Sequence, residues 1–170
     1  MYPIDDKDEV VPLEGVPQSS VGSPRPMVFA NEHNVVLAYY AQEKEFWEDS
    51  PLPQHVPEFE NIALITLKQC RVHTFGPPND EAFSGHPLTG RGLAPYGAFR
   101  IEHSSWIRQL ERMNSFHPLH RPEQSAELMH LIFSFHDSTF ECVCKAWDVA
   151  TIREDRRHII QHALELLQEV

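Results

Sequence analysis

Polar side chains that could carry acid–base chemistry alternate with aromatic residues in the segment 131–144. They are Ser134, His136, Thr139 and Glu141. Alternation with a period of two is typical of β-strands, and a two-residue tip at Asp137-Ser138 would fold the segment into a hairpin. In that register Ser134 lies opposite Glu141, on the face that points away from the aromatic row. Because a histidine next to a carboxylate can exchange protons with a substrate, the candidate catalytic residues are His136, Glu141 and Ser134.

Two considerations limit this interpretation of the hairpin. Ser134 and His136 are two positions apart on one strand, too far for a simple serine–histidine bond, so the pattern does not indicate a catalytic triad. The same side chains would also be expected on a structural outer face near a turn, with Asp137 and Ser138 in turn hydrogen bonds. Both interpretations stay open at this point.

A second candidate region is the loop from Gly76 to Gly97, which fits neither the helical nor the strand period. Loops of this length inside a domain are uncommon and are usually either functional covers or disordered. Apolar side chains give this loop anchors that a mobile linker would not need: Phe83, Leu88, Leu93 and Tyr96. We therefore expect it to be a packed cover.

Three donors in or next to this loop are candidate ligand-binding residues. His86 and Arg91 lie within it, and Arg100 follows it. Their side chains, with backbone amides exposed by nearby glycines, could bind phosphate or carboxylate. The loop matches neither a P-loop nor a dinucleotide-binding fingerprint, so no cofactor is indicated. The alternative is that Arg91 pins the loop to the fold by a salt bridge.

No metal site is predicted. Cys142 and Cys144 share the expected core face of the hairpin, where buried apolar cysteines are the simpler interpretation. His158 and His162 have the i, i+4 spacing that can chelate a metal on a helix. However, Ile159 stands where a metalloprotease has its general-base glutamate. We expect these two histidines to face solvent.

The order of the expected strands and helices predicts an α+β fold. It would have a mostly antiparallel sheet of about five or six strands, with two main helices packed on it. Strands are expected at 27–30 and 35–40 (a hairpin), at 62–66, at 98–102 and in the 131–144 hairpin. Ser104 is a predicted N-cap for a helix at 105–114, along which Trp106, Leu110 and Met113 recur at helical spacing.

The C-terminal helix is expected to open with the capping box Thr151-Ile152-Arg153-Glu154. In such a box the first and last side chains each bond a free backbone amide of the first turn. The apolar side of this helix is expected to comprise Ile160, Ala163, Leu164 and Leu167.

The amino-acid composition predicts where the folded domain begins and in which cellular compartment the protein works. Residues 1–26 combine acids with five prolines and show no periodicity, so we expect a flexible or draped acidic arm before a single domain at 27–170. Neither a basic-then-apolar leader nor an apolar run of about 20 residues occurs, which argues against export and membrane insertion. Three cysteines cannot all pair with one another, which favours a cytoplasmic protein.

The formal net charge is −11, which argues against nucleic acid as a partner because phosphate contacts dominate that affinity. The charge is unevenly distributed, since residues 61–121 hold seven Lys or Arg against four Asp or Glu. An acidic exterior favours encounter with a basic protein partner. A basic, histidine-rich middle is compatible with a small anionic ligand instead.

Several short strings are shared with other sequences. They include His86-Pro87-Leu88, Trp106-Ile107 and Met113-Asn114, and the most specific is Phe135-His136-Asp137-Ser138-Thr139-Phe140-Glu141. On these residues the chain resembles a group of small bacterial proteins to which no activity is attached. The resemblance implies a bacterial origin and transfers no catalytic role.

Two functional hypotheses follow from the sequence. The first is a non-enzymatic binding or protein-interaction module with an acidic surface that docks a basic partner. The alternative is an enzyme or receptor for a small anionic ligand bound under the Gly76–Gly97 loop. The alternative requires that the loop fold back over the polar face of the hairpin.

Overall fold

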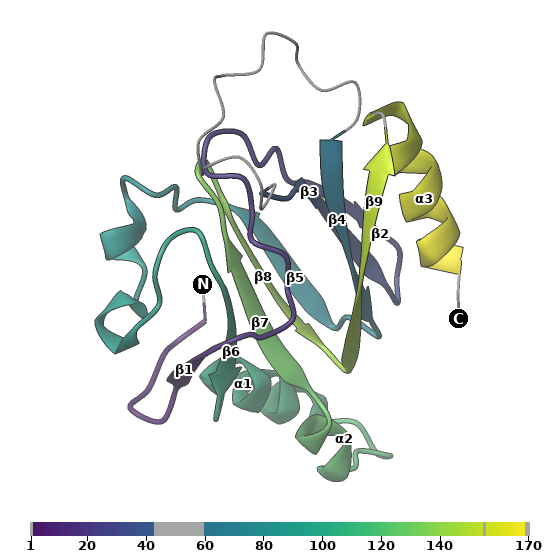
Figure 1. Cartoon of the computed structure of the whole chain (residues 1–170). Helices are drawn as coiled ribbons and strands as arrows, with labels where there is room; N and C mark the ends of the chain where they lie inside the picture. The colour runs from purple at the N-terminus through teal and green to yellow at the C-terminus, as the bar shows by residue number, and fades with distance from the viewer. Residues whose placement is uncertain (1, 43–59, 155, 169–170) are drawn as a thin grey trace, which may run out of the picture.

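The computed structural model describes residues 2–42, 60–154 and 156–168, which form two antiparallel sheets and three α-helices (Figure 1). The first sheet has the strand order β1–β6–β7–β8–β5: β1 (Glu9–Pro12), β6 (Ala98–Glu102), β7 (Met129–Ser134), β8 (Thr139–Cys144) and β5 (Val72–Gly76). The second has the order β2–β3–β4–β9: β2 (Met27–Ala30), β3 (Val35–Tyr40), β4 (Glu60–Lys68) and β9 (Ala146–Glu154). The helices are α1 (Ser105–Asn114), α2 (Glu123–Ala126) and α3 (Arg156–Gln168).

The predicted fold class, α+β with antiparallel pairing and two main helices, is confirmed. The prediction of one sheet of five or six strands is matched only in part, because the strands divide between a sheet of five and a second sheet of four. Three strands that the sequence did not indicate account for the difference between six and nine, and one of them is β5. β1 comes from the presumed arm, and β9 is a nine-residue strand in a segment assigned to a helix start.

The main core lies between the two sheets. Its buried members on the hairpin are the predicted row of alternating apolar residues: Leu131, Phe133, Phe135, Phe140, Cys142 and Cys144. From the second sheet come Val35, Leu37, Tyr39, Ala63, Ile65 and Leu67. Burial of both aromatic stretches against a second sheet fixes which side of the hairpin faces inward, and therefore which side carries Ser134 and Glu141.

Helix α3 covers the other face of the second sheet through Ile159, Ala163 and Leu167. The predicted apolar side of this helix is partly wrong, because Ile160 and Leu164 are exposed at 54% and 48%. The predicted capping box is also wrong: its four residues are part of β9 and pair with β4. A nine-residue ladder satisfies more backbone groups than a cap does, so tertiary pairing overrides the local signal.

The N-terminal segment, for which the sequence predicted an arm outside the domain, lies along the first sheet. Strand β1 pairs with β6 at its edge. Tyr2 is buried and stacks on Trp106, with ring centroids 4.7 Å apart. Asp8 is buried as well and accepts a bond from Ser105 N at 2.5 Å. Acidic and proline-rich composition did not indicate these contacts, because each depends on a partner about 100 residues away.

Helix α1 has the predicted bounds, and Ser104 caps it by accepting a bond from Ile107 N at 3.2 Å. It packs beside the outer face of the first sheet, where Trp106 contacts Tyr2 and Val143. None of the helices in the described segments is long and apolar enough to cross a membrane.

Candidate functional site

The β7–β8 hairpin carries the candidate catalytic residues, in a register that differs from the predicted one by two positions. Ser134 pairs with Thr139 rather than with Glu141. The two-residue tip is His136-Asp137, so the predicted tip at Asp137-Ser138 is wrong. A shift of two leaves each strand side chain on its predicted face. Ser134 and Glu141 therefore still point away from the aromatic row.

The 77–97 loop folds back over this polar face, as a packed cover. Three of its apolar side chains, Phe83, Leu88 and Leu93, are buried against the first sheet. The sheet contributes Phe99, Ile101 and Ile132 to this second cluster. The loop also forms two one-turn 3₁₀ helices, Phe83–Gly85 and Thr89–Arg91. The cover is therefore held by its own small core.

Glu141 lies beneath the cover as the common acceptor of three side chains. Its Oε1 is 2.8 Å from Nε2 of His86, and its Oε2 is 3.3 Å from Nε2 of His130. The hydroxyl of Tyr2 donates to the same Oε2 at 3.1 Å. All four residues are at most 9% exposed. We call this set of four the Glu141 cluster.

The outer nitrogens of the two histidines fix how their protons are arranged. Leu88 N donates to Nδ1 of His86 at 3.2 Å, so that nitrogen carries a lone pair and Nε2–H donates to Glu141. Nδ1 of His130 lies 2.9 Å from the Ser104 hydroxyl, which can donate to it. Both imidazoles can then be neutral while the carboxylate accepts every bond. The cluster is closed, with each donor matched to an acceptor.

The electrostatics of the cluster follow from burial and these bonds. Burial by itself raises the pKa of Glu141, but the hydrogen bonds from His130 and His86 outweigh it and lower the pKa to about 2. Burial lowers the pKa of His130 below its usual value. Burial and the neighbouring Glu141 carboxylate raise the pKa of Tyr2, so its hydroxyl remains a donor. An ionised carboxylate among neutral donors is the stable state of the cluster near neutral pH.

Ser134, the third candidate, is buried and fully engaged with the backbone of the loop. Its hydroxyl donates to Ala94 O at 2.8 Å and accepts from Gly97 N at 2.9 Å. These bonds hold the end of the loop onto β7. They leave the oxygen without the base that a serine nucleophile needs.

His136, by contrast, is partly exposed at the hairpin tip, in a separate cluster with two loop residues. Its Nδ1 is 2.8 Å from Asp80 Oδ2 and 2.9 Å from the hydroxyl of Tyr96, which also donates to Asp80. The bond to Asp80 raises the pKa of His136. Bonds from Tyr96 and His136 lower the pKa of Asp80. This arrangement can hold a proton on His136. Among the described residues, however, no serine, threonine or cysteine is hydrogen-bonded to it.

The three candidate ligand-binding residues have separate partners. His86 belongs to the Glu141 cluster, whereas Arg91 donates to Asp5 O at 2.5 Å and Asp8 O at 2.9 Å and so ties the loop to the N-terminal segment. Arg100 forms an ion pair with Glu102. Because Arg100 alternates along β6 with residues that face the loop, it lies on the opposite side of the sheet from His86.

The two hairpin cysteines are buried, and the two histidines of α3 lie near one carboxylate. Cys142 and Cys144 are buried in the main core, where burial raises the pKa of Cys142. His158 and His162 lie 3.5 and 3.2 Å from the same oxygen of Glu154. No group of three or more His, Cys, Asp or Glu in the described ranges is arranged to hold a metal ion.

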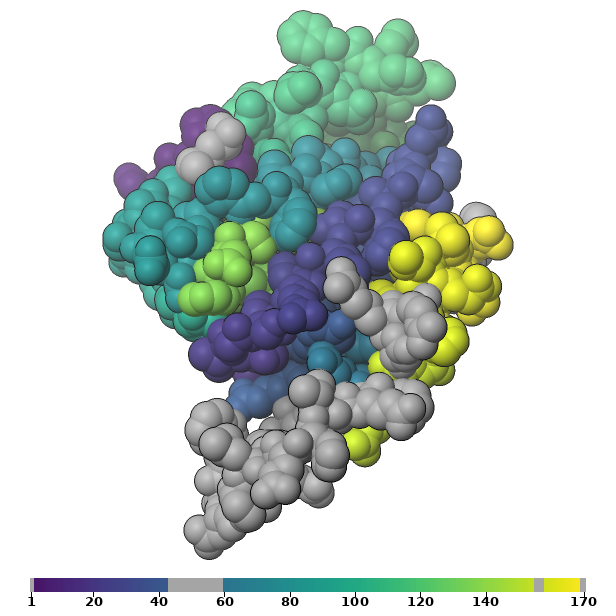
Figure 2. All heavy atoms as spheres, turned by 90° about the horizontal axis from the view of Figure 1, so that it is seen from above, coloured from purple at the N-terminus to yellow at the C-terminus, as the bar shows by residue number. Residues whose placement is uncertain are grey.

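Among the described residues, the most exposed large apolar side chains are at the end of α1 and in the turn after it. Met113, Phe116 and Leu119 are 65%, 90% and 78% exposed; we call them the α1 patch. Beside them is a groove of about 500 Å³, the α1 groove, lined by Arg71, Leu110, Glu111, Asn114, His117, Leu119, His120, Gln124, Ser125 and Leu128. The region near α2 projects at the upper edge of the space-filling view (Figure 2).

Several residues of these clusters were not identified from the sequence: Tyr2, Asp80, Tyr96, His130, Phe116 and Leu119. From the sequence, Tyr96 was interpreted only as an apolar anchor of the loop. Periodicity reports which residues share a face of one element, and it carries no signal for partners that are brought together by the loop and the N-terminal segment. Phe116 and Leu119 follow the last residue of a correctly predicted helix, where the helical period no longer applies. Met113, which the sequence placed on the apolar side of that helix, is 65% exposed.

We compared the chain with protein-family models, with curated proteins and with solved structures, and none of the three comparisons gave a match. Functional inference therefore rests on the geometry described above.

Proposed function

We propose that the protein is a non-enzymatic protein-interaction module and that the α1 patch and α1 groove are its docking surface. The observation that carries this proposal is the exposure of Met113, Phe116 and Leu119 next to a concave surface of about 500 Å³. Contiguous exposed apolar side chains with a polar rim are typical of protein-binding sites. The other residues suited to chemistry are engaged within the fold, which supports binding over catalysis.

The charge around the groove defines the partner. Arg71, His117 and His120 line the groove with a single acid, Glu111, and the charged residues that flank the lining in the sequence balance one another: Arg112, Arg121, Glu123 and Glu127. The lining therefore offers one guanidinium and two imidazoles to a carboxylate, on a chain of formal net charge −11. We propose that the partner is a protein segment with apolar side chains and carboxylates. This partner thus differs from the basic partner of the first sequence hypothesis.

An anionic membrane surface would meet the same side chains. The groove favours a protein segment, because a bilayer offers no projecting side chains to fill a cavity of about 500 Å³. A net charge of −11 also repels an anionic bilayer over the whole facing surface. Vesicles of phosphatidylglycerol and phosphatidylcholine test this directly. Sedimentation of the wild type with them, lost in a Phe116→Ser variant, would favour the membrane over the protein partner.

The alternative function, a small anionic ligand under the 77–97 loop, has less support. The space beneath the loop contains the carboxylate of Glu141, which repels anions. Arg91 and His86 are engaged in bonds within the fold, and Arg100 lies on the other side of the sheet. A thermal-shift screen with nucleotides and sugar phosphates tests this alternative. A rise in Tm that a His86→Ala variant abolishes would favour it.

The docking surface can be tested with peptides selected from a random displayed library on the wild-type protein. We expect the selected peptides to combine aromatic or aliphatic residues with Asp or Glu. Phe116→Ser should weaken their binding at least about tenfold, since loss of a large side chain at an interface centre costs about 2 kcal/mol or more. Binding measured by isothermal titration calorimetry should also weaken at high salt.

A control is Ile160→Ser, which removes another exposed apolar side chain, from α3 and away from the α1 patch. This control should leave peptide affinity unchanged. Selection of basic peptides, or equal binding to the wild type and to Phe116→Ser, would contradict the proposed docking surface.

A further inference from the structure

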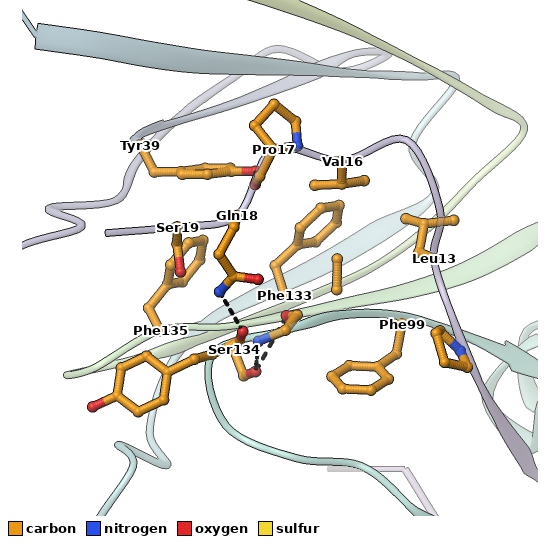
Figure 3. A pocket seen from close by; sticks show the side chains of 14 residues that line it. Leu13, Val16, Pro17, Gln18, Ser19, Tyr39, Phe99, Phe133, Ser134 and Phe135 are labelled. Atoms are coloured by element: carbon orange, nitrogen blue, oxygen red, sulfur yellow. Dashed lines mark hydrogen bonds between the residues drawn. The ribbon is translucent and has the colours of Figure 1, made fainter. Parts of the chain in front are cut away.

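A cavity of about 220 Å³ opens between the N-terminal segment and the first sheet (Figure 3). One wall is the stretch from Pro12 to Ser19, and the opposite wall comes from the start of β6 and the end of β7. Tyr39 of β3 closes one side. The solvent-exposed bond from Gln18 Nε2 to Tyr96 O, 2.7 Å long, joins the two walls. The cavity is separate from the α1 patch and from the Glu141 cluster.

Five of the fourteen residues that line the cavity are aromatic. Phe99, Phe133, Phe135, Tyr39 and Tyr96 all line the cavity, and the rings of Tyr39 and Phe135 lie 5.2 Å apart in a tilted arrangement. Aromatic walls favour a flat aromatic guest through stacked and edge-to-face contacts. An apolar cavity of about 150 Å³ is large enough for benzene, so this cavity can hold a single ring with a substituent.

The buried side-chain polar atoms of the described walls are paired, with one exception. The Tyr39 hydroxyl donates to Pro17 O at 2.6 Å, and the Ser134 hydroxyl donates to Ala94 O at 2.8 Å. Ser19 is 93% buried, yet its hydroxyl has no hydrogen-bond partner in the described structure. In Figure 3 Ser19 lies beside Tyr39 and Phe135 at one end of the cavity. A buried hydroxyl without a partner is unfavourable, and a polar group of a guest molecule would satisfy it.

We propose that this cavity binds a small molecule built on one aromatic ring with one hydrogen-bonding substituent. The ring lies among Phe99, Phe133 and Phe135, and the substituent bonds to the Ser19 hydroxyl. Binding is non-covalent. This ligand site is independent of the proposed docking surface, since none of its residues belongs to the α1 patch or the α1 groove.

Phenol and toluene test the proposal, because the two probes have nearly the same size and shape and differ in one hydroxyl. We expect both to bind at the cavity, detected as shifts of backbone amide resonances of residues 12–19 and 96–99, with phenol tighter. Ser19→Ala should reduce the affinity for phenol about three- to tenfold and leave that for toluene unchanged, the effect of losing one neutral hydrogen bond. Ser20→Ala is the matched control and should change neither affinity.

A second variant is designed to fill the cavity. Val16→Trp places a large side chain in the wall and should abolish binding of both probes, in a protein whose fold is verified by its amide spectrum. Absence of phenol binding at millimolar concentration would overturn the proposal. So would resonance shifts outside the cavity, or a Ser19→Ala variant that binds phenol as the wild type does.

Discussion

Replacing Glu141 with leucine should lower the free energy of unfolding by about 3–5 kcal/mol, the largest effect we expect from a single substitution. The carboxylate accepts bonds from His86, His130 and Tyr2, all buried. Its removal leaves three buried donors without an acceptor, and each such donor costs roughly 1–3 kcal/mol. Loss of one member of a buried charged network is similarly expensive. Urea denaturation followed by circular dichroism measures the change.

A matched control for this variant is Glu127→Leu. That carboxylate is also paired, 2.9 Å from Lys145 Nζ, but its side chain is 65% exposed. An exposed pair adds little to stability because water replaces it, so the denaturation midpoint should scarcely move. If Glu141→Leu behaved like this control, the carboxylate would not be the shared acceptor of the buried side chains.

Acid should destabilise the protein through the same cluster. The pKa of Glu141 is lowered to about 2 in the fold, so the unfolded chain takes up the proton first as the pH falls. The contribution is fully present above about pH 4.5 and is lost between about pH 4.5 and pH 2. A shift of this size corresponds to about 3 kcal/mol. The lowered pKa of His130 acts in the same direction and starts the loss of stability below about pH 6.5.

Urea titrations at a series of pH values between 7 and 2.5 measure this dependence. The wild type should lose stability continuously below pH 6.5. A Glu141→Gln variant starts from a lower stability at pH 7, and it should lack the component between pH 4.5 and pH 2. A wild-type stability that is constant over this range, or a Gln variant with the same slope, would exclude Glu141 as the titrating group.

Prediction of the strands and helices from the sequence was most accurate where one face of the element is buried. Strict alternation in 131–144 identified the hairpin and its core side, and burial of that side is why the prediction was correct. The turn itself was misplaced by one residue on each strand, since alternation is unchanged by a shift of two. The helix at 105–114 was also correctly bounded, because Ser104 is a strong local cap.

Prediction failed where partners distant in the chain decide the structure. Thr151 and Glu154 have the spacing of a cap, but nine paired positions with β4 keep them extended. The partners of Glu141 could not be identified because they are 11, 55 and 139 positions away in the chain. For the same reason the sequence grouped Arg91 and Arg100 with His86, although the fold directs each to a different partner.

The separation between Tyr2 and Glu141 also bears on the order in which the molecule assembles. A contact across 139 positions closes a loop that spans nearly the entire described chain, and the entropic cost of closing a loop grows with its length. Topologies rich in such distant contacts fold slowly, on the order of milliseconds to seconds. We therefore expect the tyrosine to dock as a late step, after the two sheets have met. Before that step the Glu141 carboxylate lacks one of its three donors, so the last stage of folding completes the hydrogen bonding of a buried charge.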